Sequence, residues 1–165
     1  MLPTGSVTFS DSDELTAAQA SVYRSMVGSL LWVAMGTRPD IAFATTVLTR
    51  YLKTPTQAAL TAAKRVLRYL KGAPGLSLVY NGAPGRLVGQ TDSSWANCAD
   101  TRRSYSGYLF SMSNGAAISW SSRLQRTVAL SSTEAEYISC AESAKEAVWL
   151  RSLVQSLGVV RSIIF

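Results

Sequence analysis

The spacing of the apolar residues changes once along this chain, at a turn formed by Gly72, Pro74 and Gly75. Before the turn, apolar residues recur about every third or fourth position, which is typical of amphipathic helices. After it they tend to alternate with polar residues, which is typical of strands with one buried face. The sequence therefore predicts helices followed by a sheet, an α+β fold class.

The helical part is predicted to span residues 21–75 and to follow a polar leader or linker at 1–20. Residues 22–36 carry an apolar block that is too long for a typical strand, so it predicts a buried helix ending at Gly36. Pro39 suits the first turn of a second helix, because that turn needs no hydrogen bond from its backbone nitrogen.

A third helix is predicted to start at Thr54. Thr54 and Gln57 have the spacing of a capping box, and Pro55 stands between them at the first helical position. Its predicted buried stripe consists of Ala59, Ala63, Val66, Leu67 and Leu70.

Residues 76–165 are predicted to form the part with the sheet. The predicted elements, in order, are strands at 86–92, 105–112, 116–120 and 127–130, a helix from about 132 to 157, and a strand starting at 159. Asn114 and Gly115 form the strongest short hairpin signal in the chain. Trp95, Trp120 and Trp149 occupy apolar-periodic positions, so we predict that they are core residues rather than stacking surfaces.

Acid–base or metal chemistry in this chain depends on carboxylates, because it contains no histidine. Its two cysteines lack the spacing of a zinc site and are predicted to be reduced thiols. The candidate pair is Asp92, at the end of a predicted strand, and Glu136, in the first turns of a predicted helix. Glu134 is the alternative to Glu136.

Both glutamates also have a structural interpretation. Ser131 and Glu134, and Thr133 and Glu136, each have the spacing of a capping box. Pattern alone favours capping for Glu136, and Asp92 equally suits a turn that follows a strand.

Basic residues are concentrated between Asp40 and Asp92, a stretch without a single acidic residue. Such a surface attracts polyanions, although a solvated helix face is an equally good interpretation. The basic residues that we consider for nucleic-acid binding are Lys64, Arg65, Arg68, Lys71, Arg102 and Arg103.

Five separated blocks carry a resemblance to a known family. They are TRPDIAFA at 37–44, AAKRVLRYLKG at 62–72, TDSSWA at 91–96, RRSYSGYLF at 102–110, and the stretch from AISW to LRSL at 117–153. Together they resemble the C-terminal part of the Pol polyprotein of copia-type LTR retrotransposons. The resemblance covers nearly everything after residue 20.

The resemblance implies a thumb-like tail of a reverse transcriptase at 21–75 and the N-terminal part of a ribonuclease H-like domain at 76–165. It implies that Asp92 and Glu136 are catalytic carboxylates that hold Mg²⁺ or Mn²⁺ and hydrolyse the RNA strand of an RNA/DNA hybrid. Glu136 is preferred to Glu134 because the family has a small residue three positions after its glutamate, here Ser139. Hydroxyl groups expected to contact nucleic acid belong to Ser93, Ser94, Ser132 and Thr133.

The chain departs from the family in its acidic residues. The family supplies a third carboxylate from an Asp-Asn step after the long helix, whereas no aspartate follows Asp100 here. We therefore expect a truncated, inactive ribonuclease H-type fragment. The alternatives are a non-catalytic remnant that binds RNA/DNA hybrids and an interaction module for the remaining Pol segments. With neither a signal peptide nor an apolar membrane span, we expect an intracellular protein of the cytoplasm or nucleus that is not secreted and has no membrane partner.

Overall fold

The computed structural model describes residues 9–10, 12–80, 86–112, 115–158 and 163–164. It has the predicted α+β composition and divides into two compact units. A helical unit consists of Met1–Ser77 with Asn97–Arg102, and a sheet unit consists of Leu78–Ala96 with Arg103–Phe165. Each unit is described by itself.

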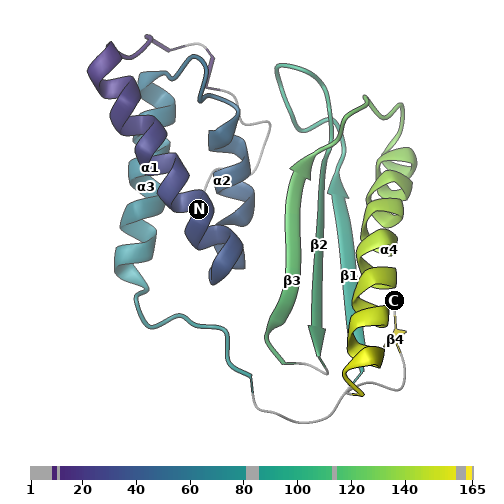
Figure 1. The fold of residues 1–165 in the computed structure, drawn as a ribbon. Helices are drawn as coiled ribbons and strands as arrows, with labels where there is room; N and C mark the ends of the chain where they lie inside the picture. Colours follow the sequence, from purple (N-terminus) through teal and green to yellow (C-terminus); the bar gives the residue numbers. More distant parts are fainter. Residues whose placement is uncertain (1–8, 11, 81–85, 113–114, 159–162, 165) are drawn as a thin grey trace. The chain divides into compact units, whose positions relative to one another are not determined.

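The helical unit contains α1 (Ala17–Gly36), a short 3₁₀ turn (Pro39–Ile41), α2 (Ala42–Thr49) and α3 (Gln57–Gly72) (Figure 1). The first helix begins five residues before its predicted start at 22. Thr16 and Gln19 form a capping box there, so residues 17–20 of the expected leader are helical. No helix in the described ranges is long and apolar enough to cross a membrane.

The third helix begins later than predicted, because Thr56 rather than Thr54 is its N-cap. The Thr56 hydroxyl accepts a hydrogen bond from the Ala59 backbone nitrogen at 3.3 Å. The preceding residues pair with another segment, since the Leu15 nitrogen donates to the Pro55 carbonyl at 3.0 Å. Of the predicted stripe, Ala59, Ala63 and Val66 are buried, Leu70 is partly buried, and Leu67 is exposed.

An ion pair at the 3₁₀ turn is hydrogen-bonded to residues at the end of α3. Arg38 contacts Asp40 at 2.8 Å and also donates to the Ala73 carbonyl at 3.2 Å. The Tyr69 hydroxyl donates to the same Asp40 carboxylate at 2.9 Å. The hydrogen bond from Arg38 lowers the pKa of Asp40 below its usual value, and that from Tyr69 adds to the effect.

Asp100, also in the helical unit, makes the same kinds of contact as Asp40. Its carboxylate accepts hydrogen bonds from Arg50 at 2.7 Å, from the Tyr51 hydroxyl at 3.2 Å and from Ser10 at 3.1 Å. These contacts hold the segment Asn97–Arg102 in the helical unit, although this segment connects two strands of the sheet unit.

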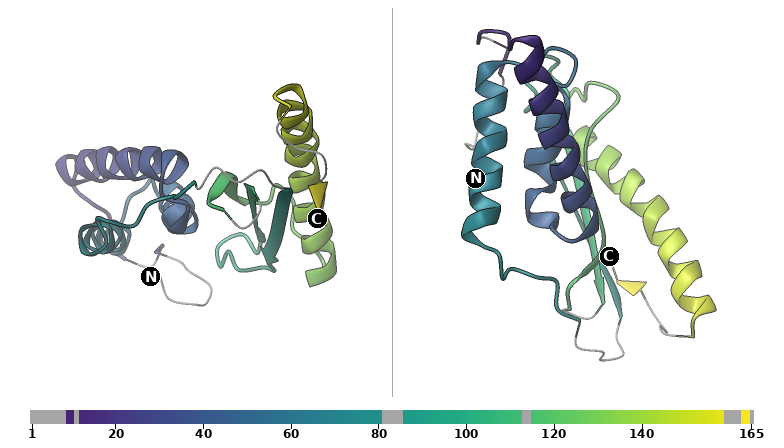
Figure 2. Two further views of the ribbon diagram at one scale, coloured as in Figure 1. Left: turned by 90° about the horizontal axis from the view of Figure 1, so that it is seen from below. Right: turned by 60° about the vertical axis from the view of Figure 1, so that its left-hand side comes forward.

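The sheet unit contains β1 (Leu87–Ser94), β2 (Tyr105–Met112), β3 (Ala117–Leu124), α4 (Ser132–Ser156) and β4 (Ile163–Ile164). The strand order is β3-β2-β1-β4, with β4 parallel to β1 and the other neighbours antiparallel. The predicted hairpin joins β2 and β3, although Asn114 itself lies outside the described residues. Figure 2 shows α4 along one face of this sheet.

The core of the sheet unit lies between α4 and strands β1 and β2. Leu87 and Phe110 pack there against Ala147 and Leu150 of the helix. Phe110 lies so close to Gly89 that a Cβ atom on this glycine would be 2.5 Å from the phenylalanine ring. The sheet therefore needs a residue without a side chain at Gly89.

The predicted strand at 127–130 is wrong. After β3, the Gln125 nitrogen still donates to the Ser104 carbonyl at 2.8 Å. The chain then leaves the sheet, and the Trp95 indole nitrogen donates to the Ala129 carbonyl at 3.1 Å. The Ala129 carbonyl thus accepts a hydrogen bond from a side chain.

Candidate active site

Asp92 lies in β1 opposite Gly107, and its side chain is exposed. The strand continues for two residues beyond its predicted end at Asp92. The Asp92 carbonyl accepts a hydrogen bond at 2.8 Å from the hydroxyl of Ser139 in α4. The same hydroxyl lies 2.8 Å from the Thr91 hydroxyl. Two neighbouring residues of β1 therefore fix the position of one turn of α4.

Glu136 precedes this contact by one helical turn. Residues three or four apart on a helix lie on the same face, so Glu136 shares its face with Ser139 and Ser143, which are buried against the sheet. Glu136 itself is exposed because it lies in the first turns of the helix. The structure thus brings the turn carrying Glu136 to the backbone of Asp92.

Glu134 caps the helix instead. Its carboxylate accepts a hydrogen bond from the Leu130 nitrogen at 2.7 Å, and its own nitrogen donates to the Ser131 hydroxyl at 3.1 Å. Ser131 is thus the N-cap that the sequence predicts, but the Glu134 carboxylate accepts from Leu130, the residue before the cap, and not from the Ser131 nitrogen that a capping box requires. The other predicted box does not form either, because the N-cap is Ser131 rather than Thr133. Capping therefore explains Glu134 and leaves Glu136 without that role.

The buried side-chain amide of Gln125 is hydrogen-bonded to the first turn of α4. Only 3% of Gln125 is exposed, and its Nε2 atom donates to the Ser106 hydroxyl at 2.8 Å and to the Ala135 carbonyl at 2.9 Å. Among the described residues, its Oε1 atom and the Ser93 hydroxyl are buried without a hydrogen-bond partner. The sequence analysis did not single out Gln125. The one feature that could have drawn attention to it is that an uncharged polar residue directly follows a strand.

Comparison with known proteins finds similarity to polyproteins of transposons. The chain is 48% identical to the retrovirus-related Pol polyprotein from transposon TNT 1-94 of Nicotiana tabacum, over 83% of the chain and 10% of that polyprotein. It is 38% identical, over 96% of the chain and 11% of the polyprotein, to the one from transposon RE1 of Arabidopsis thaliana. Over most of its length the chain is therefore similar to a segment of the retrovirus-related Pol polyproteins from transposons.

A similar sequence also makes up most of a short protein. The chain is 46% identical to secreted RxLR effector protein 161 of Plasmopara viticola, over 78% of the chain and 90% of that protein. By contrast, it spans only about a tenth of the length of the Pol polyproteins named above. No family model matches the chain, and no solved structure is significantly similar to it.

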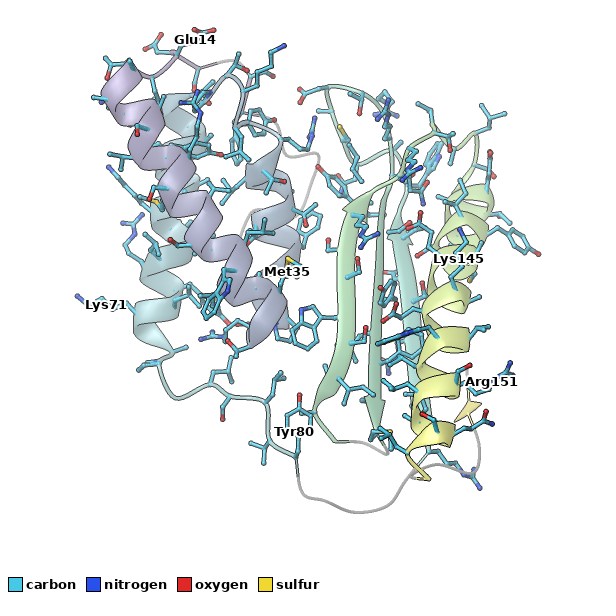
Figure 3. All side chains as sticks on the ribbon, viewed as in Figure 1. Glu14, Met35, Lys71, Tyr80, Lys145 and Arg151 are labelled. Carbon is cyan, nitrogen blue, oxygen red and sulfur yellow. The ribbon has the colours of Figure 1, made fainter. Side chains whose placement is uncertain are left out.

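The other residues predicted to contact nucleic acid lie in both units of the chain. Ser132 and Thr133 are exposed in the first turn of α4, whereas Ser93 and Ser94 are partly buried at the end of β1. Arg103 is partly buried in the sheet unit. The rest lie in the helical unit and are exposed: Lys64, Arg65, Arg68 and Lys71 on α3, and Arg102 in the segment Asn97–Arg102. Figure 3 shows Lys71 projecting outward from α3.

The candidate site offers two carboxylates and no larger cluster. Within the described ranges, no group of three or more histidine, cysteine, aspartate or glutamate side chains is arranged to hold a metal ion. In the same part of the chain, neither the Asp92 nor the Glu136 carboxylate takes part in a hydrogen bond or ion pair. Both carboxylates therefore have oxygen atoms available to a ligand, and whether they share one ion stays a prediction.

Proposed function

We propose that the sheet unit is the N-terminal part of a ribonuclease H-type domain of a copia-type element, with Asp92 and Glu136 as its first two carboxylates. The observation that carries this proposal is the 2.8 Å hydrogen bond from Ser139 to the Asp92 carbonyl. This bond holds Ser139, which lies one helical turn after Glu136, against the backbone of Asp92. The fragment would act on the RNA strand of an RNA/DNA hybrid as part of a larger domain.

The chemistry of the two side chains fits a hydrated divalent cation. Mg²⁺ prefers oxygen ligands and keeps several of its waters, so two exposed carboxylates are suitable partners. When bound, such ions activate water and stabilise the leaving oxygen in phosphodiester hydrolysis. The chain's own contribution is to fix both carboxylates on rigid elements, through Ser139 at β1 and through Gln125 beneath α4.

Metal binding tests the pair directly. We expect the 165-residue chain to bind Mn²⁺ weakly in a titration followed by electron paramagnetic resonance, and we expect binding to be lost in Asp92→Asn and in Glu136→Gln. Glu134→Gln is the matched control, since Glu134 lies in the same helix but is occupied by the cap. Binding lost in Glu134→Gln and retained in Glu136→Gln would show that the wrong glutamate was chosen.

Cleavage tests the reaction. We expect no cutting of a hybrid by this chain alone, because two carboxylates are too few to hold two ions, and losing such stabilisation costs orders of magnitude in rate. Adding the continuation that the resemblance implies, with its Asp-Asn step, should allow cutting, and Asp92→Asn should abolish it. Because β4 runs parallel to β1, its continuation would extend toward Asp92. Cutting by the unextended chain would contradict the proposed incomplete site.

We further propose that α3 binds the nucleic-acid backbone. Lys64, Arg68 and Lys71 are exposed on the face opposite the buried Ala59 and Val66. Changing the three basic residues together to alanine should weaken binding of an RNA/DNA hybrid regardless of its sequence and reduce the salt dependence of the affinity. An affinity that does not change with salt would contradict this role.

A further inference from the structure

Trp95 follows the candidate site by three residues and is not the core residue that its position in the sequence predicts. Its side chain is 48% exposed at the end of β1. The hydrogen bond from its indole nitrogen to the Ala129 carbonyl, at 3.1 Å, restricts the orientation of the ring. An exposed aromatic ring that is already oriented loses little conformational freedom on binding.

Apolar groups adjoin this ring. Ala129 is flanked in the chain by Val128 and Leu130, whose side chains are 49% and 87% exposed. The Trp95 ring and these two side chains thus belong to one short stretch of surface, beside the N-terminus of α4. A surface made of an aromatic ring and aliphatic groups suits the flat face of a nucleobase better than a sugar-phosphate backbone.

Exposed arginines on β3 and on the β3–α4 connection favour a polyanionic partner, and the acidic group beside them is Glu134, whose carboxylate accepts from the Leu130 nitrogen. From Arg103 to Thr133 the sequence contains three arginines and no acidic residue. Arg126 is exposed and lies on the same β3–α4 connection as Ala129, and Arg123 is exposed at the end of β3. A protein ligand of the apolar patch would not need these positive charges, whereas a nucleic-acid strand would be attracted by them.

We propose that Trp95 is a stacking site for one unpaired base of a nucleic-acid strand bound at the candidate active site. The proposal rests on the function proposed above and adds a specificity to it. The fragment should bind a hybrid that carries an unpaired nucleotide more tightly than a fully paired one. Base–aromatic stacking typically changes affinity by about ten-fold or more.

Two hybrids that differ only by one unpaired terminal nucleotide test this specificity. We expect the 165-residue chain to bind the hybrid with the unpaired nucleotide about ten-fold more tightly in a fluorescence anisotropy titration. Trp95→Ala should abolish this difference and leave the affinity for the paired hybrid unchanged. Trp95→Phe should retain most of the difference, since it keeps a ring, and it serves as the variant to measure if Trp95→Ala does not fold. Trp149→Ala is the matched control, because Trp149 is 57% exposed on α4.

A fluorescent base analogue at the unpaired position gives a second measurement. Its emission should fall when the parent or the Trp149→Ala variant binds, and should stay constant with Trp95→Ala. Equal affinity for the two hybrids, or equal weakening of both by Trp95→Ala, would overturn the stacking site and leave hybrid binding intact. Failure of the parent to bind either hybrid would overturn hybrid binding itself and, with it, the stacking site.

Discussion

The two units of this chain use their acidic residues in different ways. In the helical unit, Asp40 and Asp100 each accept a short ion-pair contact from an arginine and a hydrogen bond from a tyrosine. In the sheet unit, Asp92 and Glu136 are exposed, and the neutral groups of Ser139 and Gln125 position the backbone around them. The difference indicates that Asp40 and Asp100 stabilise the helical unit, while Asp92 and Glu136 are available to a ligand.

The largest effect should come from breaking the ion pair of the helical unit. Asp40→Asn leaves the partly buried Arg38 without its counter-charge, so we expect a loss of about 3 kcal/mol in the free energy of unfolding. Urea unfolding followed by far-UV circular dichroism measures it. The control is Asp13→Asn, an exposed aspartate of the same unit, which should change stability by less than about 0.5 kcal/mol.

The same pair predicts a pH dependence. Because the hydrogen bond from Arg38 lowers the pKa of Asp40 in the folded chain below its usual value of 3.8, the resulting stabilisation is present above that value. It is lost as the pH falls through the lower, folded-state pKa. The parent should therefore lose stability more steeply than Asp40→Asn below about pH 4. Parallel pH profiles would contradict a stabilising role for this pair.

A smaller effect should follow from removing the neutral support of the sheet unit. Gln125→Ala removes two buried hydrogen bonds and leaves a cavity beneath α4, for an expected loss of about 2 kcal/mol. This loss should not vary with pH, in contrast to that of Asp40→Asn. Gln155→Ala, the same substitution at an exposed position of α4, is the control for loss of a glutamine side chain without buried contacts. Equal melting temperatures of the two variants would exclude the supporting role.

A further test compares two glycines of the sheet. Gly89→Ala would place its Cβ atom 2.5 Å from the Phe110 ring and should cost about 1–2 kcal/mol. At Gly107, the nearest atom to an added Cβ is the Ser121 carbonyl oxygen at 3.6 Å, an ordinary contact. Gly107→Ala should therefore be nearly neutral in thermal denaturation. A similar loss of stability in both variants would show that the cost comes from reduced backbone flexibility rather than from contact with the Phe110 ring.

The smallest effects should come from the candidate carboxylates. Asp92→Asn and Glu136→Gln break no contact within the described residues, so each should change the free energy of unfolding by less than about 0.5 kcal/mol without metal. Glu134→Ala removes a cap and should cost about 1 kcal/mol. If Asp92→Asn or Glu136→Gln proved as destabilising as Asp40→Asn, the contrast between the two units would not hold.

Local signals predicted much of this fold. The strand at 105–112 and the helix after Ser131 have the expected bounds, because alternation and capping act within a few residues. The start of α3 was missed because Thr54 and Thr56 are both good caps. The hydrogen bond between Pro55 and the distant Leu15 keeps the residues before Thr56 out of the helix. A pattern of neighbouring residues cannot reveal such a contact.

The candidate site was predictable only in part. Asp92 and Glu136 follow from the ends of a strand and a helix together with the resemblance to the Pol family. Gln125 and the exposure of Trp95 did not follow, because each depends on a contact across the fold, with Ala135 and Ala129 respectively. A structural role for Glu134 at the start of α4 was among the alternatives, and its hydrogen bond to Leu130 supports it, whereas the role of Glu136 stays a prediction.

The pairing of β4 with β1 has a consequence for the order of folding. It joins the last strand of the sheet unit to the first, whereas β2 and β3 are neighbours in the chain. Contacts between distant residues form slowly, so we expect the β2–β3 hairpin to form early and β4 to be added last. During synthesis, β4 also leaves the ribosome after all its partners. Until then the Leu87–Val88 edge of β1 is without its neighbour, and the nascent chain is most susceptible at that edge to pairing with another molecule.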